Sequence, residues 1–185
     1  LKNSKISKHF FKNSKNIENF YQLNFEYNYK NVVIRGIIDI VTIDHKKKEI
    51  YFTDLKTGSG LCSEFQSSFI KWKYYFQSAL YIKAYSFIIK KLNLKNYTLK
   101  NFKFLYISKI EKIPVIYTVS DKWYNASFKG FYIDNIKYRG IDDLINQIKD
   151  CYKNNNFNNV NYYLDLNNIE KQKYNVELKD EFLKF

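Results

Sequence analysis

Methionine is absent from the 185-residue chain, and proline, glycine and cysteine are scarce, with one, five and two copies. Because the chain starts at Leu1 and has no methionine anywhere, we expect it to be a piece of a longer product. Cys62 and Cys151 are too few for a disulfide framework or a four-cysteine zinc or iron–sulfur site, and they fit a reducing, intracellular (cytoplasmic) compartment. No apolar run approaches the roughly 18 residues of a membrane span, and no signal peptide is visible, so we expect no membrane partner.

What the chain does contain is largely apolar, since 45% of its residues are hydrophobic and 19% are aromatic. This composition excludes wholesale disorder, and the length suits one domain with a buried core. We therefore expect a single domain over residues 1–185, with a lead-in at 1–23, a core at 24–157 and a tail at 158–185.

The formal charge of +13, from 31 Lys and Arg against 18 Asp and Glu, favours a polyanionic partner, with nucleic acid first. Codon bias is an alternative explanation, because the residues favoured by an AT-rich genome (Lys, Asn, Ile, Tyr and Phe) dominate the chain. The lysines are also scattered rather than clustered. Charge alone therefore supports nucleic-acid binding without establishing it.

The first half of the chain predicts three strands. Residues 1–22 are polar with a few apolar positions, which indicates one helix or an irregular lead-in. The run LNFEYNYKNVVIRGIIDIVTIDHKKKEIYFTDLKTG, at 23–58, then has turn signals at about Lys30-Asn31 and at DHKKK, between β-branched segments. Such short turns predict an antiparallel meander.

A segment without glycine or proline, 63–93, predicts a long helix that packs over this meander, and a break inside it is left open. Ser63, with Gln66 three residues later, is typical of a capping box. The apolar residues that step by three and four, and that we expect to face the sheet, are Phe65, Phe69, Trp72, Phe76 and Leu80.

Two further strands are predicted by FKFLYISKI and PVIYTV, and a second amphipathic helix by the apolar spacing from Ile141 to Tyr152. The tail at 161–185 is ambiguous. The order of elements predicts an α/β fold with a mixed central sheet, in which the three-strand meander is flanked by helices.

The third predicted strand ends on an acid and a base, in EIYFTDLKTGSG. Because strand side chains alternate between faces, Asp54 and Lys56 share a face, with Cα atoms roughly 7 Å apart. A lone Asp-x-Lys is weak, since a lysine-rich chain contains such triples by chance. Asp44-His45-Lys46 is a second one in a polar turn, and we regard it as a decoy.

Asp39 lies inside the apolar run VVIRGIIDIV, where a charge is costly unless it is paired or bound to a metal. One interpretation is a structural ion pair with Arg35 on the same face. The other is that Asp39 approaches Asp54 across the hairpin, and that both carboxylates share a divalent cation such as Mg²⁺ or Mn²⁺.

Gln77 and Tyr81 are four residues apart in YYFQSALYIKAY, and therefore lie one above the other on a helix face. Such a pair can orient a carboxylate, a lysine or a phosphate. Taken alone, however, Gln and Tyr at this spacing are common in helices by chance.

Together, GIIDIV, FTDLKTG and QSALY resemble the PD-(D/E)XK nuclease superfamily, with its pattern of Gly-x-x-Asp, Asp-x-Lys-Thr and Gln-x-x-x-Tyr. Within it, the chain is most similar to the RecB-like branch and to phage-type exonuclease VIII (RecE-like) nucleases. WKYYFQSALY, LYISKIEKIPVIYTV and the closing helix with its short tail also fit, so that the resemblance covers roughly residues 24–157. It implies a restriction-endonuclease-like core and a metal-dependent DNA exonuclease that acts in DNA recombination, repair or phage replication.

The resemblance also implies a role for each motif residue. Asp39 and Asp54 would bind Mg²⁺ or Mn²⁺ together with the backbone carbonyl of Leu55. Lys56 would position or activate the attacking water and stabilise charge on the phosphate. Gln77 and Tyr81 would hold the catalytic groups and the DNA in place.

One part of the family pattern is missing, because RecB-like nucleases usually carry a further His or Glu ligand upstream. His9 is the only upstream histidine, and its neighbours give no supporting pattern. Glu26 is a candidate additional metal-site residue, with a salt-bridged strand residue as the alternative.

The implied partner is DNA, while a homo-oligomer and a single-strand annealing or helicase partner are left open. Two other functions remain as alternatives. One is a non-catalytic DNA-binding module on the nuclease fold within a larger repair protein, and the other is a basic α/β binding module whose motifs are accidental.

Overall fold

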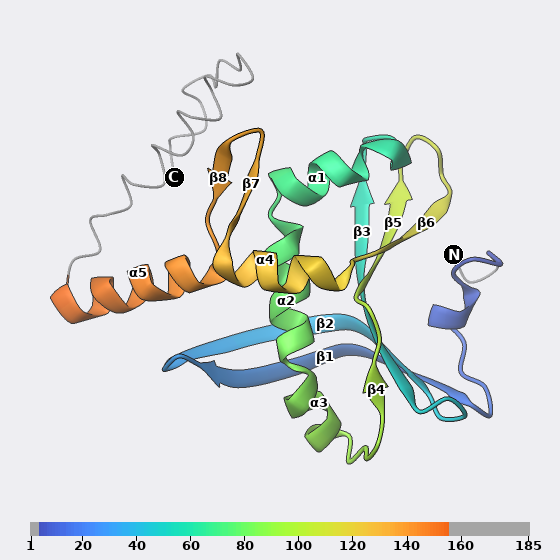
Figure 1. Ribbon diagram of the computed structural model, residues 1–185. Helices are drawn as coiled ribbons and strands as arrows, with labels where there is room; N and C mark the ends of the chain where they lie inside the picture. The colour runs from blue at the N-terminus through green and yellow to red at the C-terminus, as the bar shows by residue number, and fades with distance from the viewer. Residues whose placement is uncertain (1–3, 156–185) are drawn as a thin grey trace. The chain divides into compact units, whose positions relative to one another are not determined.

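The computed structural model describes residues 4–155 (Figure 1). The chain divides into two compact units, 1–143 and 144–185, and of the second the structure describes 144–155. The predicted tail at 161–185 lies outside the described residues. Within residues 4–155, no helix has the length and apolar character needed to cross a membrane.

The predicted antiparallel meander is confirmed. It consists of β1 (Ile17–Tyr29), β2 (Val32–Asp44) and β3 (Glu49–Gly58), with β1 and β2 paired from Ile17↔Asp44 to Tyr29↔Val32. Lys30 and Asn31 form the two-residue turn between them with φ of 50° and 64°, and a tight hairpin turn of this kind requires positive φ at both positions.

The lead-in differs from the expectation for residues 1–22, because β1 begins at Ile17 and, within the described residues 4–16, η1 (Lys8–Phe10) is the only helical part. Phe10 is buried on the sheet with Ile40 and Leu105, and this contact anchors the segment. The few apolar residues of this segment are therefore explained by the buried Phe10 ring and by the start of β1, and not by a helix.

Strand β3 changes partner along its length. Residues 49–53 pair with β2, whereas residues 53–58 pair in parallel with β5 (Lys103–Ser108). The sheet continues to β6 (Pro114–Thr118), giving the order β1-β2-β3-β5-β6, and β4 (Thr98–Leu99) also pairs with β3. The two later strands and the mixed α/β sheet are therefore confirmed.

The single long helix predicted at 63–93 is instead three short ones, α1 (Phe65–Lys71), α2 (Tyr74–Lys83) and α3 (Tyr85–Lys91). The first break falls where Lys73 adopts a left-handed conformation with φ of 54°. It turns Trp72 out of the apolar stripe, so that this side chain is 61% exposed although the spacing predicted burial.

The capping box predicted at Ser63 and Gln66 is also wrong. The 3-10 turn η2 (Cys62–Glu64) precedes α1, and here Glu64 accepts a hydrogen bond of 2.8 Å from the Leu61 backbone N–H.

The main core lies between the sheet and the three helices (Figure 1). Phe65 and Phe69 of α1 pack on Phe104 of β5 with ring centroids 5.6 and 6.0 Å apart. Buried residues of β2 and β3, including Val41 and Phe52, complete this layer. Aromatic residues thus make up much of this helix–sheet interface.

Two elements between 119 and 140 were not predicted. They are α4 (Asp121–Lys129) and a hairpin of β7 (Phe131–Ile133) and β8 (Ile136–Tyr138). Gly130 joins them with φ of 84°, and a Cβ there would lie 2.6 Å from the Tyr138 carbonyl oxygen, so only glycine fits. The predicted amphipathic helix follows as α5 (Ile141–Asn154).

Candidate active site

The candidate site lies where β2 and β3 separate. Their backbone ladder ends at Ile40↔Thr53, so Asp39 and Asp54 are the next residues in register. Asp39 Oδ2 accepts a hydrogen bond of 2.8 Å from the Leu55 backbone N–H, in place of a ladder bond. In a strand, the N–H and C=O of one residue leave on the same side, so the Leu55 carbonyl also faces the gap beside Asp39.

The second oxygen of Asp39 is held by a residue that was not predicted. Gln22 Nε2 donates a hydrogen bond of 3.0 Å to Asp39 Oδ1. Gln22 has φ of 54° in the middle of β1, and it lies between Phe20 and Leu23, which both pack on the main core although they are three residues apart. Residues three apart lie on opposite faces of a regular strand, so the left-handed residue reverses the face of β1 beside Asp39.

Asp54 is the buried acid of the site, with a side chain 3% exposed. Gln77 Nε2 donates a 2.5 Å hydrogen bond to its Oδ1. Lys56 Nζ lies 2.6 Å from its Oδ2 in a short ion pair. Burial raises the pKa of Asp54, as does the Asp39 charge, while Lys56 and Gln77 oppose the shift.

Gln77, on α2, connects the acid to the base. Its Oε1 accepts a hydrogen bond of 2.8 Å from Lys56 Nζ while its Nε2 faces Asp54, and Nε2 also donates to the Tyr81 hydroxyl at 3.1 Å. Lys56 Nζ lies 4.6 Å above the centre of the Tyr74 ring. We call Asp39, Asp54, Lys56, Gln77 and Tyr81 the carboxylate–lysine cluster.

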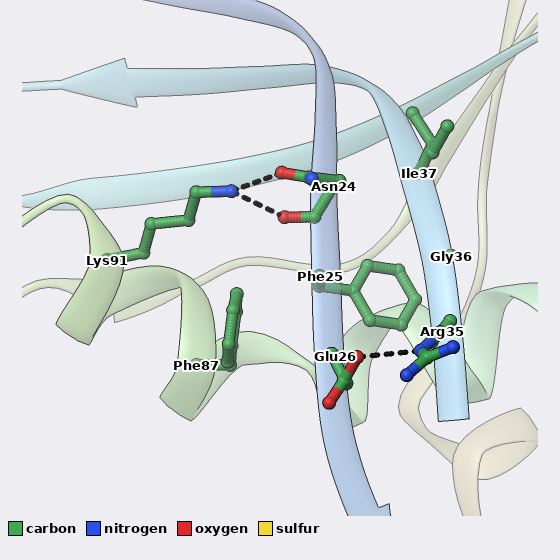
Figure 2. A pocket seen from close by; sticks show the side chains of 8 residues that line it. All are labelled: Asn24, Phe25, Glu26, Arg35, Gly36, Ile37, Phe87 and Lys91. Atoms are coloured by element: carbon green, nitrogen blue, oxygen red, sulfur yellow. Dashed lines mark hydrogen bonds and ion pairs between the residues drawn. The ribbon is translucent and has the colours of Figure 1, made fainter. Parts of the chain in front are cut away.

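Tyr81 is positioned by a contact that explains the glycine of GIIDIV. Gly36 is paired with Phe25, and a Cβ on Gly36 would lie 2.5 Å from the Phe25 ring (Figure 2). The ring therefore lies across the glycine, and it packs edge-on against Tyr81 with centroids 5.3 Å apart. Burial raises the pKa of Tyr81, so its phenol is neutral at pH 7.

The other candidate residues lie outside this cluster. Glu26 accepts a 2.7 Å hydrogen bond from Arg35 in an exposed cross-strand ion pair, so Arg35 is not the partner of Asp39. His9 packs against Phe10, with ring centroids 3.9 Å apart, and burial lowers its pKa. Asp44 accepts from the Lys47 backbone N–H within the turn, as expected of a decoy.

A pocket of about 370 Å³ lies beside β1, β2 and α3, and its lining includes Glu26 and Arg35 but no member of the cluster (Figure 2). Lys91 crosses it and donates hydrogen bonds to the backbone and side-chain oxygens of Asn24. The polar side chains that line this pocket are thus paired with one another. The carboxylate–lysine cluster is therefore the better candidate for a catalytic site.

The cluster offers hard oxygen donors that suit a divalent cation. They are the carboxylates of Asp39 and Asp54 and the Leu55 carbonyl. Among residues 4–155, no three Asp, Glu, His or Cys side chains form a metal-binding group. A cation would therefore need water for its remaining ligands, as Mg²⁺ commonly does.

No protein-family model matches the chain, and no curated protein matches it either. The geometry of the cluster is therefore what bears on function.

Proposed function

We propose that the chain is a metal-dependent DNA nuclease of the PD-(D/E)XK type, with a restriction-endonuclease-like core and RecB-like motifs, and that it acts as an exonuclease. The observation that carries this proposal is the position of Gln77, whose amide contacts both Asp54 and Lys56. A helix residue that joins an acid and a base at a strand end is hard to explain as packing alone. The positive charge of the chain suits a DNA partner.

In this proposal Asp39, Asp54 and the Leu55 carbonyl would hold Mg²⁺ or Mn²⁺. Such a cation polarises a phosphoryl oxygen and lowers the pKa of a bound water. Gln22 and the Leu55 N–H fix the rotamer of Asp39, while Gln77 fixes that of Asp54. The carboxylates are therefore oriented before the substrate arrives.

Lys56 supplies positive charge beside the scissile phosphate and holds the attacking water by a hydrogen bond. Gln77 Oε1 and the Tyr74 ring hold the Lys56 ammonium in place. The Lys56 side chain is 20% exposed. Tyr81 holds the Gln77 amide in register, so it acts through its neighbour as a positioning residue.

The experiment is a cleavage assay on end-labelled linear DNA and closed circular DNA, with Mg²⁺ or with chelator. We expect Mg²⁺-dependent loss of the linear DNA only, and loss of cleavage in Asp54→Asn. Asp44→Asn, a matched change in the turn, should cleave like wild type. Cleavage that persists in chelator or in Asp54→Asn contradicts the proposal.

One observation favours a second function, a non-catalytic DNA-binding module within a larger repair protein. Lys56 already neutralises Asp54 at 2.6 Å, which is what a domain that never binds a cation would need. DNA binding that weakens with salt, together with no cleavage in Mg²⁺ or Mn²⁺, would support this function instead. We leave a homo-oligomer and a single-strand annealing or helicase partner as further parts of either proposal.

A further inference from the structure

Trp72 is exposed, although the apolar spacing of the sequence predicts that it is buried. It ends α1 at the break before α2, and its side chain is 61% exposed. The other tryptophan, Trp123, packs against Phe69 and Phe131 with ring centroids 5.0 and 5.1 Å apart. Trp72 is thus exposed to solvent, whereas Trp123 packs against the main core.

The break that exposes Trp72 is itself an unfavourable conformation. Lys73 has φ of 54°, and a left-handed backbone is unfavourable for a residue with a Cβ. Continuing the helix would avoid this cost and would return Trp72 to the apolar stripe.

The surroundings of Trp72 are basic, and Trp72 lies two positions before Tyr74, whose ring contacts Lys56 of the proposed catalytic site. Lys71 and Lys73 flank it and are exposed, with Lys71 Nζ 5.2 Å from the ring centre. Two residues further on, the Tyr74 ring carries Lys56 Nζ at 4.6 Å. Because two residues of chain span at most about 7 Å, the Cα atoms of Trp72 and Tyr74 lie within that distance of each other.

From these observations, and resting on the proposed nuclease function, we propose that Trp72 is a stacking platform for a nucleobase of the single-stranded DNA substrate. An exposed aromatic ring flanked by cations is the usual means of binding single strands, since bases stack on the ring and lysines follow the backbone. Bases inside a duplex are covered by their neighbours. The substrate class is therefore a DNA end or overhang with unstacked bases.

The test measures binding of a fluorescently labelled dT12 oligonucleotide and of closed circular duplex, in chelator so that nothing is cleaved. Trp72→Ala should weaken dT12 binding about five- to 150-fold, the range for loss of one base–aromatic stack, and should change duplex binding less than about threefold. The ratio between wild type and Trp72→Ala should persist when salt is raised, although both affinities fall. Tyr132→Ala, which removes another exposed ring, is the matched control and should bind like wild type.

The variant Trp72→Phe keeps an aromatic ring for stacking but removes the tryptophan fluorescence at this position. It should bind dT12 nearly as well as wild type, but the quenching of tryptophan fluorescence by dT12 should disappear, because the remaining Trp123 lies in the aromatic core. Unchanged dT12 affinity in Trp72→Ala, or equal losses for dT12 and duplex, would overturn the stacking site.

The two proposals fail differently. Mg²⁺-dependent cleavage with no effect of Trp72→Ala on dT12 binding overturns the stacking site and leaves the nuclease. Quenching and selective loss of dT12 binding without any cleavage supports the stacking site and overturns the nuclease. Failure of wild type to bind either DNA overturns both.

Discussion

Replacing Lys56 with methionine should destabilise the protein in a pH-dependent way. The change keeps an unbranched side chain that is one atom shorter, and it removes the charge that lies 2.6 Å from Asp54, whose side chain is 3% exposed. Removing one partner of a buried ion pair typically costs about 3–5 kcal/mol, because the other charge is left without compensation. Asp54 can limit this cost by taking up a proton.

The limit can be worked out from the ordinary pKa of aspartate, about 3.9, since each pH unit above it costs about 1.36 kcal/mol of protonation free energy. At pH 7 protonation costs about 4 kcal/mol, so we expect Lys56→Met to lose about 3–4 kcal/mol. At pH 5 the limit is only about 1.5 kcal/mol. The pKa of Asp54 is raised by burial already, and loss of Lys56 raises it further, so the folded state binds the proton more tightly and the deficit grows as pH rises from 4 toward 7.

Urea unfolding of wild type and Lys56→Met at pH 5 and pH 7, both in chelator, measures this difference. Lys100→Met is the control, because Lys100 pairs with Glu49 at 3.0 Å with its own side chain 43% exposed, so that solvent screens this ion pair. Hydrogen bonds from Tyr51 and Lys100 lower the pKa of Glu49, so this control should hardly change between the two pH values. A deficit of Lys56→Met that is equal at both pH values, or below about 1 kcal/mol at pH 7, would refute the reasoning.

Three further predictions concern the same cluster. Tyr81→Phe removes the hydroxyl that accepts from Gln77, and should slow Mg²⁺-dependent cleavage about five- to tenfold, the equivalent of about 1 kcal/mol, while the melting temperature stays within a few degrees; an unchanged rate would leave Tyr81 as a packing residue. Gln22→Gly suits the left-handed backbone but loses the hydrogen bond to Asp39, so urea unfolding should show equal or greater stability while the cleavage rate falls; a fall in stability would mean that the side chain matters for folding instead. Mg²⁺ at about 100 times its dissociation constant should stabilise wild type by about 2.7 kcal/mol, read as a melting temperature several degrees higher, and should not stabilise Asp54→Asn; equal shifts would place the cation elsewhere.

The meander and the acid–base pair at its end could be predicted because their signals are local. The alternation of apolar residues around Asp54, and the polar turn at Lys30-Asn31, are visible within a few positions. The pairing of Asp39 with the Leu55 N–H needs only the hairpin register. Gln77 could be placed near them because its helix follows directly.

The features that could not be predicted depend on single backbone conformations. Lys73 and Gln22 both adopt left-handed φ, and neither residue type signals it, since glycine or asparagine is the usual choice. Because the helix breaks at Lys73, Trp72 is exposed although the apolar spacing predicted that it would be buried. The hairpin after α4 was overlooked although Asp134-Asn135, with φ of 49° and 64°, is a readable turn signal between short strands.

The change of partner along β3 also bears on the order in which the molecule folds. The pairings among β1, β2 and β3 close short loops and can form early, whereas β5 returns to β3 only after α1, α2 and α3. We expect Asp39 to find the Leu55 amide in a nascent chain that has just completed the meander. Gln77 arrives later, with the helices of the crossover, and only then are Asp54 and Lys56 enclosed. A newly made chain would thus acquire the assembled cluster at a late step, after the strands that carry its acids are already paired.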